Sequence, residues 1–340
     1  MDQQTNNVHT LPAEWPIEHV PTDRLRPDPA TDFALSPVPE ALTGSIRQLG
    51  VLTPLIACRQ GEAVAVVCGH RRLTLLNQLA TQTAPVRIAP GPLGTARKLL
   101  LQLNDNRAHR TFSDIETGRA LIRLSASGMN EDDLVGNVLP LFGQPVSKKR
   151  LHDFLNARDF SMDLQQLLHD LALPLKTYAM IFGWDDAGRK AAHNLFTHLR
   201  PGANKCRDLL ELIDETAHRD GQSPARLIQN EAVQKTLDDA SLSPGDRYQA
   251  AHRFFFQQRY PTLSSLRTEV RLALGRMGLD GKIRLRVPEH FESGEMKAEF
   301  TFHTREEFVE KVERLFAAAD SEALDVLLKI VRSPESLLTK

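Results

Sequence analysis

Two arginines that follow a glycine at the start of an expected helix are the residues of this chain best suited to bind an anion. Gly69 ends an apolar run, and His70, Arg71 and Arg72 come next. At such a turn from strand to helix, free backbone N–H groups, the positive end of the helix dipole and the guanidinium groups converge. Glycine lets the backbone approach a phosphate closely, and arginine grips two phosphate oxygens. The order predicts a phosphate-binding turn, although a solvated pair of arginines explains the spacing equally well.

A second candidate site is the pair Asp105 and Asn106, which follows an expected helix over residues 95–104. The side-chain oxygens of a carboxylate and a carboxamide are suitable ligands for Mg2+, an ion commonly shared with substrate phosphates. We therefore expect this pair to lie near the phosphate-binding turn.

A third candidate site is a basic helix start that follows an expected helix over 130–141 and a turn at 143–145. Its first residues are Ser147, Lys148, Lys149 and Arg150. In a helix-turn-helix, the first residues of the second helix meet the major groove of DNA. Cations oppose the dipole at a helix start, so their presence here indicates a purpose. The pattern predicts DNA contacts at these four residues, with simple solvation as the alternative.

The elements that must position these groups fall into an α+β part and a helical part. Residues 20–90 predict a compact unit, with a helix at 40–49, strands at 51–58, 63–68 and 85–89, and a helix from 70. Further helices are expected at 113–127 and 147–157 and throughout 162–277, where no repeat period is visible. Ser113 stands three residues before Glu116, which predicts a capping pair at the first of these helices. The tail predicts two strands around a Ser293-Gly294 turn and then helices at 305–319 and 321–331.

Composition limits the classes of protein that these elements can form. The 340 residues are 41% hydrophobic and 25% charged, with a formal net charge of -1, so any DNA binding must come from a local basic patch. The cysteines and histidines show no zinc-ligand spacing. No stretch approaches the roughly 18 apolar residues of a membrane span, and no export signal is visible. We expect a cytoplasmic protein with no membrane partner.

The order of several segments resembles the N-terminal domain of the ParB family. These segments are residues 20–29, residues 45–55, the Gly69-His70-Arg71-Arg72 turn, and residues 105–116, which are similar to the family's E-N-x-Q-R-x-x-L-x-x-x-E box. The likeness spans about residues 15–185. It implies a small ParB/sulfiredoxin-like α+β domain followed by a helix-turn-helix, in a chain of α+β class.

The resemblance also implies ligands and partners. ParB proteins bind CTP with Mg2+, and nucleotide binding closes a homodimer into a clamp on double-stranded DNA. The resemblance thus implies a nucleoid-associated protein of chromosome or plasmid partition or nucleoid organisation, with a ParA-type ATPase as a possible partner. Carried over to this chain, the phosphate-binding turn Gly69–Arg72 holds the phosphates, and Asp105 and Asn106 become the metal-binding and catalytic pair. The nucleotide pocket is then lined by Gly50, Thr53, Pro54 and Leu55.

Two departures from the family pattern leave other functions open. His70 stands where the family has Glu, and Asp105 is one methylene shorter than the family's Glu. A weak CTPase and binding without turnover are both compatible with these changes. The alternatives are an enzyme on the same fold, either a nuclease or a phosphotransferase, and a degenerate scaffold that binds DNA or protein without nucleotide.

The resemblance and the composition predict five segments along the chain. They are a flexible arm at 1–19, a nucleotide-binding domain at 20–110, a helix-turn-helix domain at 111–185, a helical region at 186–280, and a ββαα module at 281–340. Apolar positions in the last module, including Phe308, Val312 and Phe316, exceed the needs of two short helices and predict a dimer interface. The arginine- and aromatic-rich run 253–260 predicts helix core, with base stacking as the weaker alternative.

Overall fold

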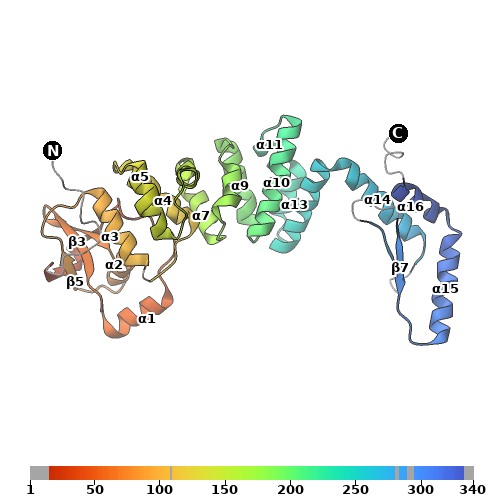
Figure 1. The fold of residues 1–340 in the computed structure, drawn as a ribbon. Coiled ribbons are helices and arrows are strands. Elements are labelled where there is room, and N and C mark those ends of the chain that lie inside the picture. Colours follow the sequence, from red (N-terminus) through yellow and green to blue (C-terminus); the bar gives the residue numbers. More distant parts are fainter. Residues whose placement is uncertain (1–14, 108, 280–282, 289–294, 333–340) are drawn as a thin grey trace. The chain divides into compact units, whose positions relative to one another are not determined.

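The computed structural model describes residues 15–107, 109–279, 283–288 and 295–332. The chain is of mixed α+β class, mostly helical, with a small sheet near its N-terminus (Figure 1). It separates into two compact units, one built from Met1–Glu211, Ser223–Asn230 and Ser243–Gly245, and the other from Leu212–Gln222, Glu231–Leu242 and Asp246–Lys340. Each unit is described separately below.

A five-stranded sheet begins the first unit, with the strand order β1-β5-β3-β4-β2. Its strands are β1 (Ile17–Pro21), β2 (Leu25–Pro27), β3 (Leu55–Gln60), β4 (Ala63–Cys68) and β5 (Thr83–Ile88). β3 pairs antiparallel with β4 and parallel with β5, whereas β1 closes the other side of β5 in antiparallel register. The predicted α+β unit is therefore present.

Both faces of this sheet are covered, which explains the nearly continuous apolar runs of β3 and β4. The helices are α1 (Glu40–Leu49), α2 (His70–Gln78) and α3 (Thr95–Arg107), with a short 3-10 turn, η1 (Thr22–Arg24). Leu73 and Leu76 of α2 pack against one face, and Leu101 of α3 packs against the other. A strand that is buried on both faces does not alternate between apolar and polar residues. The end of β4 and the start of α2 are thereby fixed in the interior.

The rest of the first unit is helical. Its elements are α4 (Asp114–Ala126), α5 (Glu131–Asp133), η2 (Leu134–Val138), η3 (Leu139–Phe142), α6 (Lys148–Leu155), η4 (Asn156–Asp159), α7 (Met162–Asp170), α8 (Leu175–Tyr178), η5 (Ala179–Ile181), α9 (Asp186–Leu199), the first part of α10 (Ala203–Asp220) and α11 (Pro224–Ile228). The capping pair expected at the start of α4 is present, because Ser113 and Glu116 exchange hydrogen bonds with each other's backbone.

Two expectations about this unit are wrong. The single helix expected at 130–141 is a short α-helix followed by one π turn and one 3-10 turn. Pro140 lacks a backbone N–H and cannot make the next α-helical hydrogen bond, which accounts for the change. The arm expected at 1–19 overlaps the sheet, because Trp15 is buried and β1 begins at Ile17. Residues 1–14 lie outside the described residues.

The second unit contains α12 (Glu231–Asp238), most of α13 (Pro244–Arg259), α14 (Pro261–Arg276), β6 (Ile283–Arg286), β7 (Lys297–Phe300), α15 (Arg305–Ala319) and α16 (Glu322–Arg332). β6 and β7 pair antiparallel, and the two helices follow, so the ββαα order is confirmed. The Ser293-Gly294 turn lies outside the described residues. One apolar core joins α14 and α16, with Leu266, Val270, Leu327 and Ile330 buried in it. Among the described residues, no helix combines the length and apolar character that a membrane crossing requires.

Candidate functional site: a cavity at the start of α2

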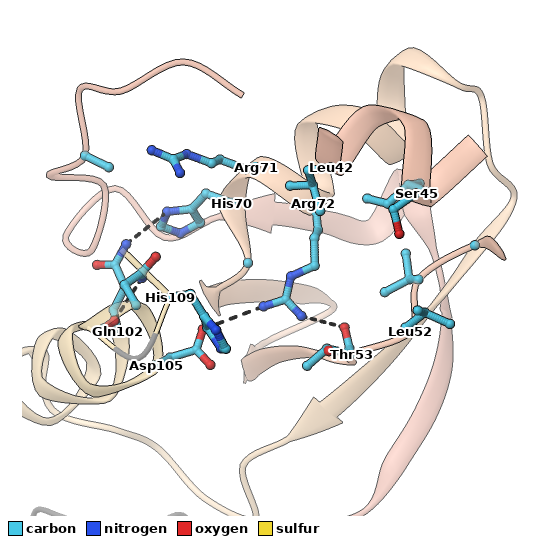
Figure 2. Close-up of a pocket in the computed structure, with 16 residues that line it drawn as sticks. Leu42, Ser45, Leu52, Thr53, His70, Arg71, Arg72, Gln102, Asp105 and His109 are labelled. Atoms are coloured by element: carbon cyan, nitrogen blue, oxygen red, sulfur yellow. Dashed lines mark hydrogen bonds and ion pairs between the residues drawn. The ribbon is translucent and has the colours of Figure 1, made fainter. Parts of the chain in front are cut away.

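A cavity of about 360 Å³ lies beside the start of α2, within the usual size of sites for small ligands. Figure 2 shows its lining side chains, which come from α1, the loop before β3, the start of α2 and the end of α3. The lining residues are Ala34, Leu42, Ser45, Ile46, Gly50, Val51, Leu52, Thr53, Gly69, His70, Arg71, Arg72, Gln102, Asp105, Asn106 and His109. The predicted phosphate-binding turn and the predicted Asp105–Asn106 pair therefore meet in one cavity.

Gly69 occupies a position that no other residue fits. Its φ is 98°, in the left-handed region, and an added Cβ would lie 2.5 Å from Leu55 Cδ2 and 3.1 Å from the guanidinium carbon of Arg72. A side chain here would be strained and would also displace both neighbours. The glycine thus keeps the first backbone turn of α2 accessible at the wall of the cavity.

Arg72 is held in place by the loop before β3 and by α3. Its Nη1 donates to the carbonyl oxygens of Thr53, at 2.5 Å, and Pro54, at 3.0 Å. Its Nη2 lies 3.6 Å from Asp105 Oδ2, and the side chain is only 15% exposed (Figure 2). A guanidinium group with several fixed partners loses little further freedom when it binds an anion.

Arg71 links the cavity to the helical part of the unit. Its Nη2 donates to the Ser36 carbonyl at 3.2 Å. Burial, together with the nearby Arg110 cation, lowers the pKa of Arg71. The backbone N–H of Ser36 points in turn to Glu116 Oε1 at 3.4 Å, so a chain of contacts runs from α2 to the start of α4.

Glu116 is the centre of a buried polar cluster at that junction. Its side chain is 0% exposed and accepts two hydrogen bonds from Arg110 Nη1, at 2.9 and 3.1 Å, and one from the Leu35 N–H at 2.9 Å. Burial alone favours the neutral acid, but these hydrogen bonds hold the pKa of Glu116 below its usual value. The sequence marks Glu116 as a helix cap and as the last residue of the family box, but its ion pair with Arg110 depends on the tertiary fold.

His70 lines the cavity, and both of its ring nitrogens are hydrogen-bonded to the fold. Its Nε2 lies 2.9 Å from the Val66 carbonyl, which can only accept, so Nε2 carries the proton. Its Nδ1 then accepts from the Gln102 side-chain amide at 3.4 Å (Figure 2). The departure from the family's Glu at this position therefore places a histidine that braces α2 against α3.

Gln102 is a lining residue that the sequence analysis missed. Its side chain is buried, and its Oε1 has no hydrogen-bond partner among the described residues. Gln102 lies three and four residues before Asp105 and Asn106, so helical spacing places all three near one face of α3. That spacing was the available signal. A buried acceptor without a partner beside a cavity is suited to a ligand N–H or O–H group.

The remaining predicted lining residues divide into two groups. Gly50 and Thr53 line this cavity. Pro54 and Leu55 are not among its lining residues: Pro54 contributes a carbonyl to Arg72, and Leu55 is fully buried in the sheet core beneath Gly69. Asp105 and Asn106 lie in the last turn of α3 rather than after it. Asn106 Nδ2 donates to the Gln102 carbonyl, so the amide oxygen of Asn106 is not used in that hydrogen bond.

Comparison with known proteins identifies one sequence relative. The chain is 32% identical over 99 residues to a probable plasmid-partitioning protein ParB of Thermus thermophilus, a match that covers 28% of this chain and 33% of the relative. Over these residues the chain is similar to that ParB protein. The match spans about a third of the relative's length, and no family model matches the chain.

Two solved ParB structures from Caulobacter crescentus also align with the chain. One is a C-terminally truncated ParB complexed with CTP-gamma-S, with 18% identity, coverage of 52% of this chain and 97% of that chain, and a TM-score of 0.25. The other is complexed to the centromeric parS site, with 14% identity, coverage of 57% and 98%, and a TM-score of 0.32. Neither TM-score reaches the level at which two whole chains share a fold.

The helix predicted to meet DNA is α6. Ser147 caps it by accepting from the Arg150 N–H at 3.3 Å, and Arg150 Nε donates to the Gln144 side chain at 2.9 Å. The two lysines are more accessible: the side chain of Lys148 is 62% exposed and that of Lys149 is 86% exposed. Lys148 lies 3.0 Å from Asp132 and Lys149 lies 3.1 Å from Asp153. Of the four predicted DNA-contact residues, the two lysines are therefore the exposed cations.

Proposed function

We propose that this chain is a DNA-binding protein of the ParB type, switched by CTP and acting in partition or nucleoid organisation. The observation that carries the proposal is the cavity at α2, in which the left-handed Gly69, two arginines and Asp105 converge. The relation to a plasmid-partitioning ParB supports the biological role.

The residues of the cavity fit a nucleoside triphosphate with a divalent cation. Gly69 lines the cavity at the N-terminus of α2, where a phosphate would meet free backbone N–H groups and the positive end of the helix dipole. Arg71 and Arg72 would hold phosphate oxygens, and the Oε1 of Gln102 would accept from a ligand donor. Asp105 and Asn106 would hold Mg2+, which neutralises phosphate charge when bound.

DNA binding is proposed at the start of α6, through Lys148 and Lys149, with Ser147 and Arg150 positioning the helix. Lysines that face phosphates position a protein on DNA without reading bases. The Arg71–Ser36–Glu116 contacts connect the cavity to α4, so a change in the orientation of Arg71 acts on the junction with the helical part.

A homodimer is proposed through α15. Phe308, Val309, Val312 and Phe316 are large apolar side chains between 41% and 72% exposed, whereas the apolar side of α16 is buried against α14. A row of exposed apolar residues on one helix is typical of a surface that associates. The dimer prediction thus applies to α15, and the apolar residues of α16 belong to the core of the unit.

The decisive experiment is a comparison of CTP, ATP, GTP and UTP binding, with Mg2+, by isothermal titration calorimetry. We expect the wild type to prefer CTP and Arg72→Ala to lose at least tenfold in affinity, because the variant removes a charge-assisted phosphate contact. Arg59→Ala, an exposed arginine paired with Glu18 at the edge of the sheet, is the matched control. Equal or absent binding of all four nucleotides would contradict the proposal.

The scaffold alternative makes the opposite prediction for stability. A ligand that binds only the folded state raises the melting temperature, so saturating CTP with Mg2+ should stabilise the wild type. No shift in melting temperature, combined with intact DNA binding, would favour a scaffold. An enzyme on this fold has less support, because Asp105 is the single carboxylate among the described residues that line the cavity.

A further inference from the structure

A second basic groove lies in the other compact unit, between α13 and α14. The two helices are joined by Tyr260 alone, and Pro261 starts α14 at its first position. The groove has a volume of about 290 Å³. Its lining residues are His252, Arg253, Phe256, Gln257, Ser264, Arg267, Thr268 and Arg271.

The charged side chains that line this groove are all positive. Among the residues that the structure describes, three arginines and no carboxylate line it, and all three arginines are exposed. The surrounding residues 244–276 contain six arginines, no lysine and only two acidic residues, in a chain with a formal net charge of -1. A local excess of arginine in a neutral protein creates an attractive field for anions at that place.

The aromatic side chains of α13 form a row along one side of the helix. Tyr248, His252, Phe256 and Tyr260 recur every fourth residue, and successive ring centroids lie 5.8, 6.1 and 5.0 Å apart. Phe256 is half-buried and faces the groove. The helix core expected of this run is present at Phe255, which is fully buried, whereas the adjacent Phe254 and Phe256 are half-buried.

Arg267 is positioned over this row. Its guanidinium carbon lies 4.8 Å from the centroid of the Phe256 ring. A guanidinium group that contacts a ring through its face keeps its in-plane N–H donors available for phosphate oxygens. Ser264 adds a polar atom to the same wall, because its buried Oγ has no hydrogen-bond partner among the described residues.

We propose that the α13–α14 groove binds the phosphodiester backbone of DNA, as a second contact separate from α6 and from the cavity at α2. The choice of DNA among polyanions rests on the proposed function. The groove offers arginine forks for phosphates, an aromatic face for an exposed base or sugar, and no base-reading element. Binding there is independent of base sequence and strongly dependent on salt.

The test measures DNA affinity against salt concentration for the full chain, by fluorescence anisotropy. The probes are a duplex of unrelated sequence and a single strand of the same length. For the double variant Arg267→Gln, Arg271→Gln, we expect the slope of log affinity against log salt to become shallower by about 2, since each lost phosphate contact removes about 0.9. Affinity at low salt should fall at least tenfold. The duplex and single-strand arms show which form of the backbone the groove prefers.

The control is Arg276→Gln with Arg305→Gln, two exposed arginines of the same unit that do not line the groove. An unchanged slope in the groove variant, or an equal change in the control, would overturn the proposal. Thermal melting checks that the groove variant is folded. Arg267→Lys, which keeps the charge but not the planar contact with Phe256, provides a milder second variant.

Repeating the series with Lys148→Gln and Lys149→Gln separates the groove from α6. Because these variants lose binding at α6 alone, the groove substitutions should still make the salt dependence shallower by the same amount.

Discussion

The cavity at α2 and the groove between α13 and α14 both gather arginine side chains, but the two sets of guanidinium groups are held differently. In the cavity, Arg72 is 15% exposed and donates to two carbonyls beside Asp105. In the groove, Arg253 and Arg271 are exposed, and Arg267 rests on a phenylalanine ring. The cavity arginine is thus fixed by hydrogen bonds before any ligand binds, whereas the groove arginines are exposed to solvent.

The difference in burial predicts a difference in ligand. A fixed, enclosed arginine suits a small anion of one shape, because little freedom remains to be lost on binding. Exposed arginines suit a long polyanion whose position along the groove is not fixed. Salt screens exposed charges over about 10 Å at 0.1 M, but it screens buried pairs much less. Nucleotide binding should therefore tolerate salt better than DNA binding.

The largest effect is expected from Gly69→Ala, which breaks the cavity and leaves the groove unchanged. The new Cβ meets Leu55 and Arg72 and forces a left-handed residue to carry a side chain. We expect nucleotide affinity to fall about 100-fold by calorimetry, and the free energy of unfolding to drop by at least 1 kcal/mol. Gly61→Ala is the matched control, since its φ is also positive but nothing lies within 4 Å of the added atom. Equal loss of nucleotide affinity in both variants would contradict this account of Gly69.

Glu116→Gln tests how much the buried polar cluster behind the cavity contributes to the stability of the fold. The substitution leaves Arg110 partly buried without its carboxylate, which should lower the free energy of unfolding by about 3 kcal/mol. Chemical denaturation measures this loss. Glu18→Gln, which removes the partner of the exposed Arg59, should change it by less than about 0.5 kcal/mol. A small effect of Glu116→Gln would show that the cluster contributes little to stability.

The same residue predicts a dependence of stability on pH. The folded-state pKa of Glu116 is lower than its unfolded value, so its contribution is fully present above the ordinary glutamate pKa of about 4.3 and is lost as pH falls through the folded value. The wild type should therefore lose stability on acidification below that pH more steeply than Glu116→Gln. Parallel acid-denaturation curves for the two proteins would contradict this prediction.

Phe256→Leu sharpens the comparison from the side of the groove. The variant keeps an apolar side chain but removes the aromatic ring beneath Arg267, which interrupts the row of aromatic side chains on α13. Loss of one stacked base costs about 1 kcal/mol or more, so affinity for a single strand should fall about fivefold, with a smaller loss for duplex. Nucleotide binding should not change. A larger loss for duplex than for single strand would assign Phe256 a packing role instead.

Asp132→Asn should have the smallest effect and the opposite sign. Asp132 lies 3.0 Å from Lys148 at the exposed start of α6, where it competes with DNA phosphates for that lysine. Removing the carboxylate charge should raise DNA affinity about twofold, mainly through faster association. Asp153→Asn makes the same test for Lys149. A fall in affinity in either variant would show that the acidic partner positions the lysine for binding.

The sequence by itself determined the local features of the site. The apolar run before Gly69, the arginines after it and the Ser113–Glu116 cap are each specified within a few residues, and the structure confirms the strand, the helix start and the cap. The ββαα order of the tail was likewise readable from the period of its apolar residues. Hydrophobic period, turn residues and caps act over one or two turns of chain, which is why the sequence alone is enough for them.

Only the tertiary structure decided which of those residues meet. His70 pairs with Gln102 across 32 positions, Arg72 reaches the carbonyls before β3, and Leu55 enters the sheet core instead of the cavity. The exposed arginines and the half-buried Phe256 of the second groove also look like ordinary helix residues in the sequence. Contacts between distant segments depend on how sheet and helices pack, and burial changes what a charge or a ring can do. The same residue types therefore give an enclosed site in one unit and an open groove in the other.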